Sequence, residues 1–208
     1  ADGITFQYNV IGNPTPGMEG SSLKDRSVGT VIRYNWIQSG ARLLDLVDPE
    51  DSFAVIGRES DTYVYGNILI NDFDQTPHST NMIHFGGDTG ATEMYRQNLH
   101  FYHNTLVTIN GMRDRGWRTS YFDLPTGEQT VYLTNNIFDR HGDAFLYLMR
   151  SGGGHAVLNG VNWFNHDWSP AENSQYHPFS GTVISNGIVL AGTGSPLRDV
   201  FQYDFRLK

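Results

Sequence analysis

The sequence predicts an all-β protein that folds as one parallel β-helix, a solenoid of about six or seven coils. Three observations predict this fold class. A short strand pattern recurs along the chain, an asparagine turn recurs beside it, and the composition is that of a turn-rich β protein. The chain has 208 residues with 23 glycines, 13% aromatic and 17% charged residues, which differs from the balance of a helical or disordered protein.

The first repeated element is a short strand in which two apolar residues flank one polar or titratable residue. Residues alternate between the two faces of a strand, so the flanking residues point to one side and the middle residue to the other. If the copies stack in parallel, the middle residues form one solvent-facing column. We expect this column to contain Lys24, Asp45, His84, Asp123 and Tyr147. Asp25 is an exception, because it holds a flanking position that is apolar in the other copies.

The second repeated element is an asparagine that follows a β-like stretch and precedes another. Asparagine tolerates the left-handed backbone region, so we expect these residues themselves to form the sharp bend between two short strands. The copies lie at Asn9, Asn35, Asn67, Asn104, Asn136 and Asn162. Their unequal spacing suggests that loops of different length interrupt a constant coil, whereas propeller blades should repeat more evenly.

Four long segments are expected to leave the coil beside the column and to wall a groove there. They span residues 49–61, 71–81, 86–97 and 110–118.

We treat residues 1–208 as one β-helix domain, part of a longer precursor or assembly, because no linker or charge block divides the chain. No capping element is apparent before Ile4 or after Phe205. An open solenoid end exposes a strand edge and core side chains. We therefore expect another polypeptide, such as a second copy, to cover at least one end.

Composition also restricts the function classes. The net charge of −8 argues against a general nucleic-acid binder, which normally has a basic surface. No apolar run is long enough to span a bilayer, so we expect neither a nucleic-acid nor a membrane partner. The absence of cysteine excludes disulfides and thiolate metal sites.

Two segments carry a resemblance to a known group of proteins. Residues 22–27 (Ser-Leu-Lys-Asp-Arg-Ser), leading to residues 31–37 (Val-Ile-Arg-Tyr-Asn-Trp-Ile), resemble bacterial secreted proteins of the pectate-lyase-like superfamily. Residues 204–208 look like their last coil. The resemblance implies a right-handed parallel β-helix and a secreted or cell-surface location.

A narrower similarity is to the chondroitinase B and alginate lyase family. Its members carry a glutamate five residues before a catalytic lysine, as Glu19 and Lys24 stand here. Their catalytic arginine lies at the position where this sequence has Asp45.

The leading functional hypothesis is an extracellular lyase that cleaves an acidic polysaccharide by β-elimination. Such an enzyme neutralises a uronate carboxylate, removes the C5 proton and protonates the leaving oxygen. Lys24 or His84 is the candidate base, Arg26 the carboxylate partner and Tyr147 the proton donor; Asp45 and Asp123 complete the candidate catalytic set. The candidate substrate-binding residues are Arg33, Arg42, Trp117 and Arg118. We expect Trp117 to be the sugar platform and Trp36 to pack in the core.

Three alternatives stay open. The column is also consistent with a salt-bridged ladder on a non-catalytic scaffold whose ends stack on neighbours. A glycoside hydrolase would use Asp45 and Asp123, which stand two coils or about 10 Å apart, close to the separation in inverting enzymes. No cofactor is required, although Asp45, Asp48 and Asp88 are a possible oxygen-ligand set for Ca²⁺.

Overall fold

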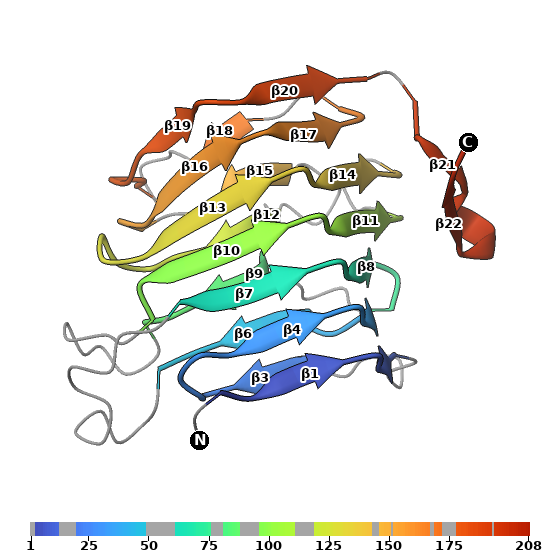
Figure 1. The fold of residues 1–208 in the computed structure, drawn as a ribbon. Coiled ribbons are helices and arrows are strands. Elements are labelled where there is room, and N and C mark those ends of the chain that lie inside the picture. The colour runs from blue at the N-terminus through green and yellow to red at the C-terminus, as the bar shows by residue number, and fades with distance from the viewer. Residues whose placement is uncertain are drawn as a thin grey trace.

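The computed structural model shows a nearly all-β chain in which three parallel sheets are stacked coil upon coil (Figure 1). The residues that the structure describes are 3–12, 20–48, 61–75, 81–87, 96–110, 119–142, 146–150, 152–166, 169–171, 178–192 and 194–208.

In chain order, each of the first six coils contributes one strand to each sheet, and the described residues of the seventh contribute one strand to each of the first two sheets. The first sheet contains β1 (Thr5–Gln7), β4 (Val31–Arg33), β7 (Thr62–Tyr65), β10 (Asn98–Tyr102), β13 (Thr130–Thr134), β16 (His155–Asn159) and β19 (Val183–Ser185). The second sheet contains β2 (Val10–Ile11), β5 (Trp36–Gln38), β8 (Ile68–Asp72), β11 (Thr105–Ile109), β14 (Ile137–Arg140), β17 (Val161–Phe164) and β20 (Ile188–Ala191). The third sheet contains β3 (Leu23–Asp25), β6 (Leu44–Leu46), β9 (Asn81–Phe85), β12 (Thr119–Asp123), β15 (Leu146–Met149) and β18 (Ser169–Ala171).

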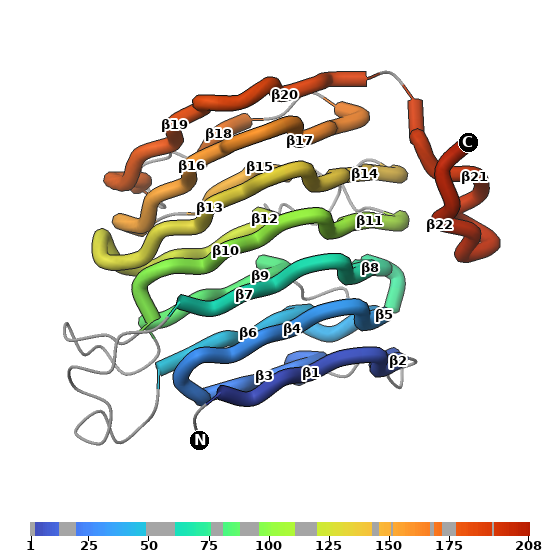
Figure 2. Tube along the Cα trace, in the orientation of Figure 1, coloured from blue at the N-terminus to red at the C-terminus, as the bar shows by residue number. Residues whose placement is uncertain are grey.

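This topology confirms the predicted all-β class and is consistent with a parallel β-helix. Every strand of the three sheets pairs in parallel with the strand of the neighbouring coil, for example β10 with β7 and β13. Seven strands in each of the first two sheets match the predicted six or seven coils. Figure 2 shows the coils in sequence order from the N-terminus upward.

The interior of the coil is filled by stacked apolar side chains, one layer for each coil. From the first sheet, Ile32, Val64, Phe101, Leu133 and Leu158 are all fully buried. Phe138 and Phe164 of the second sheet stack with ring centroids 4.5 Å apart. Each buried side chain of this size contributes roughly 1.5–3 kcal/mol relative to an exposed one, so repetition of the coil builds one continuous core.

The recurring asparagines form a buried hydrogen-bonded ladder at the bend between the first and second sheets. In one central rung, the backbone N–H and the side-chain Nδ2 of Asn67 both donate to Oδ1 of Asn104 at 3.0 Å. Asn67 Oδ1 accepts the same two bonds from Asn35, and its Nδ2 also donates to the Ile32 carbonyl. Both polar atoms of each central amide are therefore satisfied inside the protein.

The expectation that these asparagines adopt the left-handed conformation was wrong. The residue immediately before the asparagine has the positive φ in five coils: Tyr8, Tyr34, Gly66, His103 and Asn135. In the sixth it is Gly160, two residues before Asn162. The asparagine amide turns inward to bond the next coil, and its neighbour makes the bend.

The C-terminal segment is a hairpin that packs on the outside of the second sheet, not a last coil. β21 (Leu197–Asp199) and β22 (Asp204–Leu207) pair antiparallel around the 3₁₀ turn η3 (Val200–Gln202). Figure 1 shows the hairpin beside the second sheet. Leu197 and Val200 cover the outward side chains of Ile70, Val107 and Ile109.

The prediction that Trp36 packs in the core was wrong. This side chain lies on the outer face of β5, where its ring contacts Phe205 with centroids 5.1 Å apart and Tyr203 with centroids 6.0 Å apart. It is therefore held between the coil and the hairpin instead of filling the interior.

Within the described part of the chain, no helix has the length and apolar character needed to cross a bilayer.

Candidate functional site

The predicted column exists on the outer face of the third sheet, although one member differs from the prediction. Lys24 pairs with Asp45, Asp45 with His84, and His84 with Asp123 in adjacent strands. Tyr147 was misplaced, because it pairs with Ser120 instead of Asp123. Since Phe122 pairs with Met149, the rung above Asp123 is Arg150. The observed register differs from the predicted one by three residues, so Tyr147 lies in the row of Ser120 and Asn81 instead of the row of His84 and Asp123.

The expectation that this column faces solvent along its whole length was also wrong. Asp45 is 2% exposed and His84 is 4% exposed, whereas the side chain of Lys24 is 44% exposed. Asp45 and His84 point away from the coil interior, because their contacts are with Lys24 and Arg42 on the outer face. The middle of the column is therefore a buried charged cluster with cations at its surface.

Asp45 is at the centre of this cluster. Its Oδ1 accepts from Arg42 Nη1 at 2.7 Å and lies 3.0 Å from His84 Nδ1. Its Oδ2 is 3.0 Å from Lys24 Nζ and 3.2 Å from Ser21 Oγ. Burial alone would raise the pKa of Asp45, but the hydrogen bonds from His84, Lys24 and Arg42 outweigh it and hold that pKa well below its usual range.

The contact with Asp45 orients the His84 ring and leaves its Nε2 atom available. Nδ1 lies 3.0 Å from Asp45 Oδ1 and 3.1 Å from Arg42 Nη1, and a single nitrogen cannot both donate to the first and accept from the second. We assign the proton to Nδ1, because Arg42 already donates to Asp45 at 2.7 Å. Nε2 then carries a lone pair and has no hydrogen-bond partner among the described residues.

Asp123 has the opposite environment from Asp45. Burial raises the pKa of Asp123, and the nearby charges of His84, Arg150 and Arg42 offset only part of that effect. Its Oδ2 accepts from Asn81 Nδ2 at 3.0 Å, while Arg150 Nη1 is 3.7 Å away. The ion pair is long and the carboxyl is largely covered, so burial decides the direction. Two carboxyls two coils apart thus have pKa values displaced in opposite directions, an arrangement common in catalytic sites.

The other catalytic and metal candidates lie apart from this cluster. Arg26 Nη1 donates to the backbone carbonyl of Asp48, so the Arg26 guanidinium is directed at the residues that follow β6 and not at His84. Asp48 Oδ2 accepts from the Gly87 N–H at 2.7 Å. Asp88, the third calcium candidate, lies outside the described residues. Because Asp45 is surrounded by Lys24, Arg42 and His84, its local charge disfavours a bound cation.

The four substrate-binding candidates are not brought together. Arg42 joins the cluster through Asp45. Arg33 lies on β4 of the first sheet, a different face of the coil. Trp117 and Arg118 lie outside the described residues, as do Glu19 and most of the four long segments that were expected to wall a groove.

The structure also explains the exceptional flanking residue Asp25. It points inward and forms a buried ion pair with Arg96, whose Nη2 lies 2.7 Å from Asp25 Oδ2. Arg96 is fully buried and donates further to the carbonyls of Ser27 and Val47. Arg96 was missed because its partner is 71 positions away; the only sequence signal was the carboxylate at an apolar position. This pair links Asp25 of β3 to a residue that lies just before β10, and it is apart from the column.

Comparison of the chain with protein-family models, with curated proteins and with solved structures finds no match.

Proposed function

We propose that the chain is an extracellular carbohydrate-active protein that cleaves an acidic polysaccharide by β-elimination at the outer face of the third sheet. The observation that carries the proposal is the Asp45–His84 pair at 3.0 Å, set among the cations Lys24, Arg42 and Arg150 and next to Asp123. A polyanionic chain fits a cationic surface, and β-elimination needs one base and one acid near each other.

In the proposed reaction, His84 Nε2 takes the C5 proton of a uronate. Asp45 holds the Nδ1–H and stabilises the imidazolium that forms. Arg42 and Lys24 neutralise the substrate carboxylate, which makes the C5 proton more acidic. The C5 electron pair forms the C4–C5 double bond as the C4–O bond breaks, and the leaving oxygen takes a proton from Asp123.

Asp123 replaces Tyr147 as the proton donor in this proposal for two reasons. Asp123 is on the rung adjacent to His84, about 4.8 Å along the stack, whereas Tyr147 is displaced from that row. The raised pKa of Asp123 also favours the protonated form that a general acid needs.

The geometry gives less support to the glycoside hydrolase. A catalytic base must have an oxygen available for water, but both oxygens of Asp45 already receive donors from Lys24, Arg42, His84 and Ser21. The ring nitrogen of His84 is the better candidate base.

The test is a screen of acidic polysaccharides, followed through the ultraviolet absorbance of the unsaturated sugar that elimination leaves. We expect absorbance to rise with at least one uronate polymer and with no neutral polymer. Release of reducing ends without this absorbance would indicate hydrolysis instead and would contradict the proposal.

We also propose a right-handed coil and secretion, as the resemblance implies; right-handed crossovers are the general rule for parallel strands. A partner that covers an end of the solenoid remains a proposal too. Exposed apolar side chains support it: Val10 on the first coil, and Ile188 and Leu190 on the last one described. Size measurement in solution tests this proposal, and a stable monomer of 23.4 kDa would oppose it.

A further inference from the structure

Arg33 differs from four other arginines in having no carboxylate partner among the described residues. Arg42, Arg96, Arg150 and Arg206 each form an ion pair with an aspartate. The guanidinium of Arg33 is instead held by two neutral groups. Its Nε donates to Gln7 Oε1 at 2.8 Å and its Nη1 donates to the Tyr65 hydroxyl at 2.9 Å. An arginine has five N–H donors, so the two bonds fix the guanidinium and leave donors of the Nη edge available.

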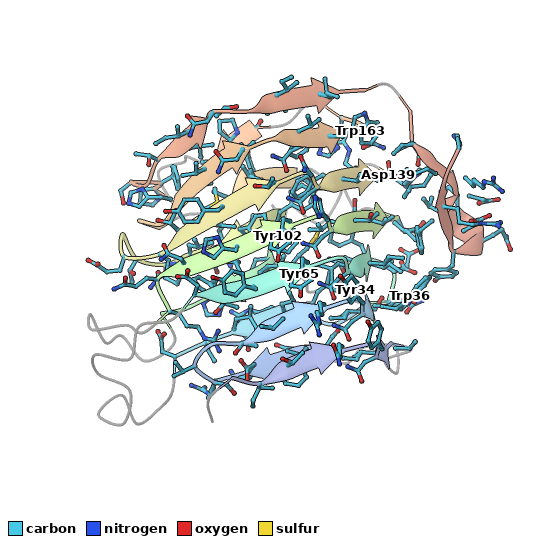
Figure 3. All side chains as sticks on the ribbon, in the orientation of Figure 1. Tyr34, Trp36, Tyr65, Tyr102, Asp139 and Trp163 are labelled. Atoms are coloured by element: carbon cyan, nitrogen blue, oxygen red, sulfur yellow. The ribbon has the colours of Figure 1, made fainter. Side chains whose placement is uncertain are left out.

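Aromatic rings surround this cation on the outer face of the first sheet. The Arg33 Cζ is 5.9 Å from the ring centroid of Tyr34 and 6.0 Å from that of Tyr65. Tyr8 stacks on Tyr34 with centroids 5.6 Å apart, and Tyr65 meets Tyr34 edge-on. Tyr34 is 47% exposed and Tyr8 is 73% exposed. Figure 3 labels Tyr34 and Tyr65 on the sheet that faces the viewer, with Tyr102 on the next strand.

The backbone is shaped to hold the Tyr34 ring in this position. Tyr34 has a φ of 55°, which turns its side chain out of the strand row. Its ring lies where the next coil has Gly66, and a Cβ on Gly66 would come within 2.7 Å of ring atoms. A residue larger than glycine there would displace the ring. The ring is therefore held in one place on the surface before any ligand arrives.

We propose that Arg33, Tyr34, Tyr65 and Tyr8 form a second binding site for an acidic polysaccharide, separate from the candidate catalytic face. A sugar carboxylate binds the free edge of the Arg33 guanidinium in a bidentate pair, and sugar rings pack on the exposed tyrosines. The class of ligand rests on the proposed function, whereas the site itself rests on Arg33 and its aromatic neighbours.

The two sites serve different steps because they lie on different sheets. Arg33 is on the first sheet and His84 is on the third, and Figure 1 shows these sheets at the front and the back of the coil. A single sugar unit cannot contact both. The second site therefore retains a polymer near the protein without taking part in bond cleavage.

The experiment measures binding of two uronate polymers, polygalacturonate and alginate, by affinity electrophoresis and calorimetry. All variants are made in a His84→Ala background, so that cleavage does not consume the polymer. Arg33→Gln should weaken binding about tenfold, and Tyr34→Ala should also weaken it. The matched control is Arg206→Gln, which removes the same charge from an exposed arginine on the C-terminal hairpin and should leave binding unchanged. Circular dichroism checks that each variant is folded.

The result that overturns the site is Arg33→Gln binding as tightly as its parent, or Arg206→Gln weakening binding equally, which would show a general charge effect. Equal binding of a neutral polymer such as dextran would overturn the acidic ligand class. If Arg33→Gln weakens binding but no polymer yields an unsaturated product, the proposed lyase fails and the second site stands. If product forms and Arg33→Gln changes nothing, the lyase stands and this site fails.

Discussion

The asparagine ladder and the Lys24–Asp45–His84–Asp123–Arg150 column are both stacks of polar side chains on successive coils, yet they differ in chemistry. The ladder repeats one neutral group, and in its central rungs each amide donates to the next coil and accepts from the previous one. The column contains carboxylates, amines and an imidazole, and its bonds are concentrated on Asp45.

The two stacks differ in which polar atoms stay available for a ligand after the intramolecular hydrogen bonds are made. The amides in the central rungs of the ladder are hydrogen-bonded to one another, which offsets the desolvation cost of burying them. These amides therefore have no polar atom left for a ligand. The column leaves His84 Nε2 without a partner among the described residues and displaces the pKa values of Asp45 and Asp123 in opposite directions. We infer that the ladder serves the fold and that the column is where chemistry is to be sought.

The largest expected effect comes from the column. His84→Ala should lower turnover of a uronate polymer by about a thousandfold, because it removes the proposed base. Because His84 is buried, it should also cost about 1 kcal/mol of unfolding free energy through the lost hydrogen bond to Asp45. Steady-state kinetics and denaturant unfolding measure the two effects.

A matched control exists on the first sheet. His100 Nε2 lies 3.0 Å from Asp61 Oδ2, so the chain has a second aspartate–histidine pair outside the column. His100→Ala should leave turnover unchanged. If both variants lose activity equally, the loss reflects damage to the fold, and the functional distinction between the column and the rest of the surface fails.

The next effect concerns the ladder. Asn104→Ala should lower the free energy of unfolding by about 3 kcal/mol, because the backbone N–H and the amide of Asn67 both lose their buried acceptor. Asn9→Ala, at the exposed end of the ladder, removes only the Nδ2 donor to Asn35 Oδ1 and should cost about 1 kcal/mol or less. Denaturant unfolding measures both variants. Equal losses in the free energy of unfolding would show that a central asparagine stabilises the fold no more than the one at the end of the ladder.

Much of the fold could be predicted from the sequence because the coil repeats. Apolar positions and asparagines recur in step, and stacking one repeat on the next specifies parallel sheets. The register around Tyr147 was wrong by three residues, because Phe122 pairs with Met149 instead of Leu146. Leu146, Leu148 and Met149 are all apolar and buried, so the apolar pattern does not distinguish the two registers. Position along a row depends on strand ends, which short apolar patterns do not define.

The site was predicted less completely, since its properties depend on distant neighbours. Lys24, Asp45, His84 and Asp123 followed from the alternation, but the burial of His84 did not, because alternation predicts only which way a side chain points. Arg33 was recognised as a binding candidate, yet its separation from Arg42 required knowing which sheet each strand joins. The pairing of Asp25 with Arg96 depends on a contact between segments far apart in the chain.

The smallest expected effect is the pH dependence of Asp123. Folding raises the pKa of Asp123, so this carboxyl binds its proton more tightly in the native state than in the unfolded state. The contribution of Asp123 to native stability therefore falls as pH rises through the carboxyl range. Asp123→Asn removes this proton equilibrium. Relative to wild type, the variant should therefore gain stability as pH increases from about 4 toward 7, by at most about 1 kcal/mol, because Arg150 and His84 partly compensate the charge.

Denaturant unfolding at several pH values measures the difference, with Asp204→Asn as the control. Asp204 has a pKa lowered to about 2, chiefly by its hydrogen bond from Arg206, so its contribution is lost as pH falls and its variant should show the opposite slope. A parallel slope in the two variants would contradict the assignment of Asp123 as the carboxyl that tends to keep its proton, and with it the proposed general acid.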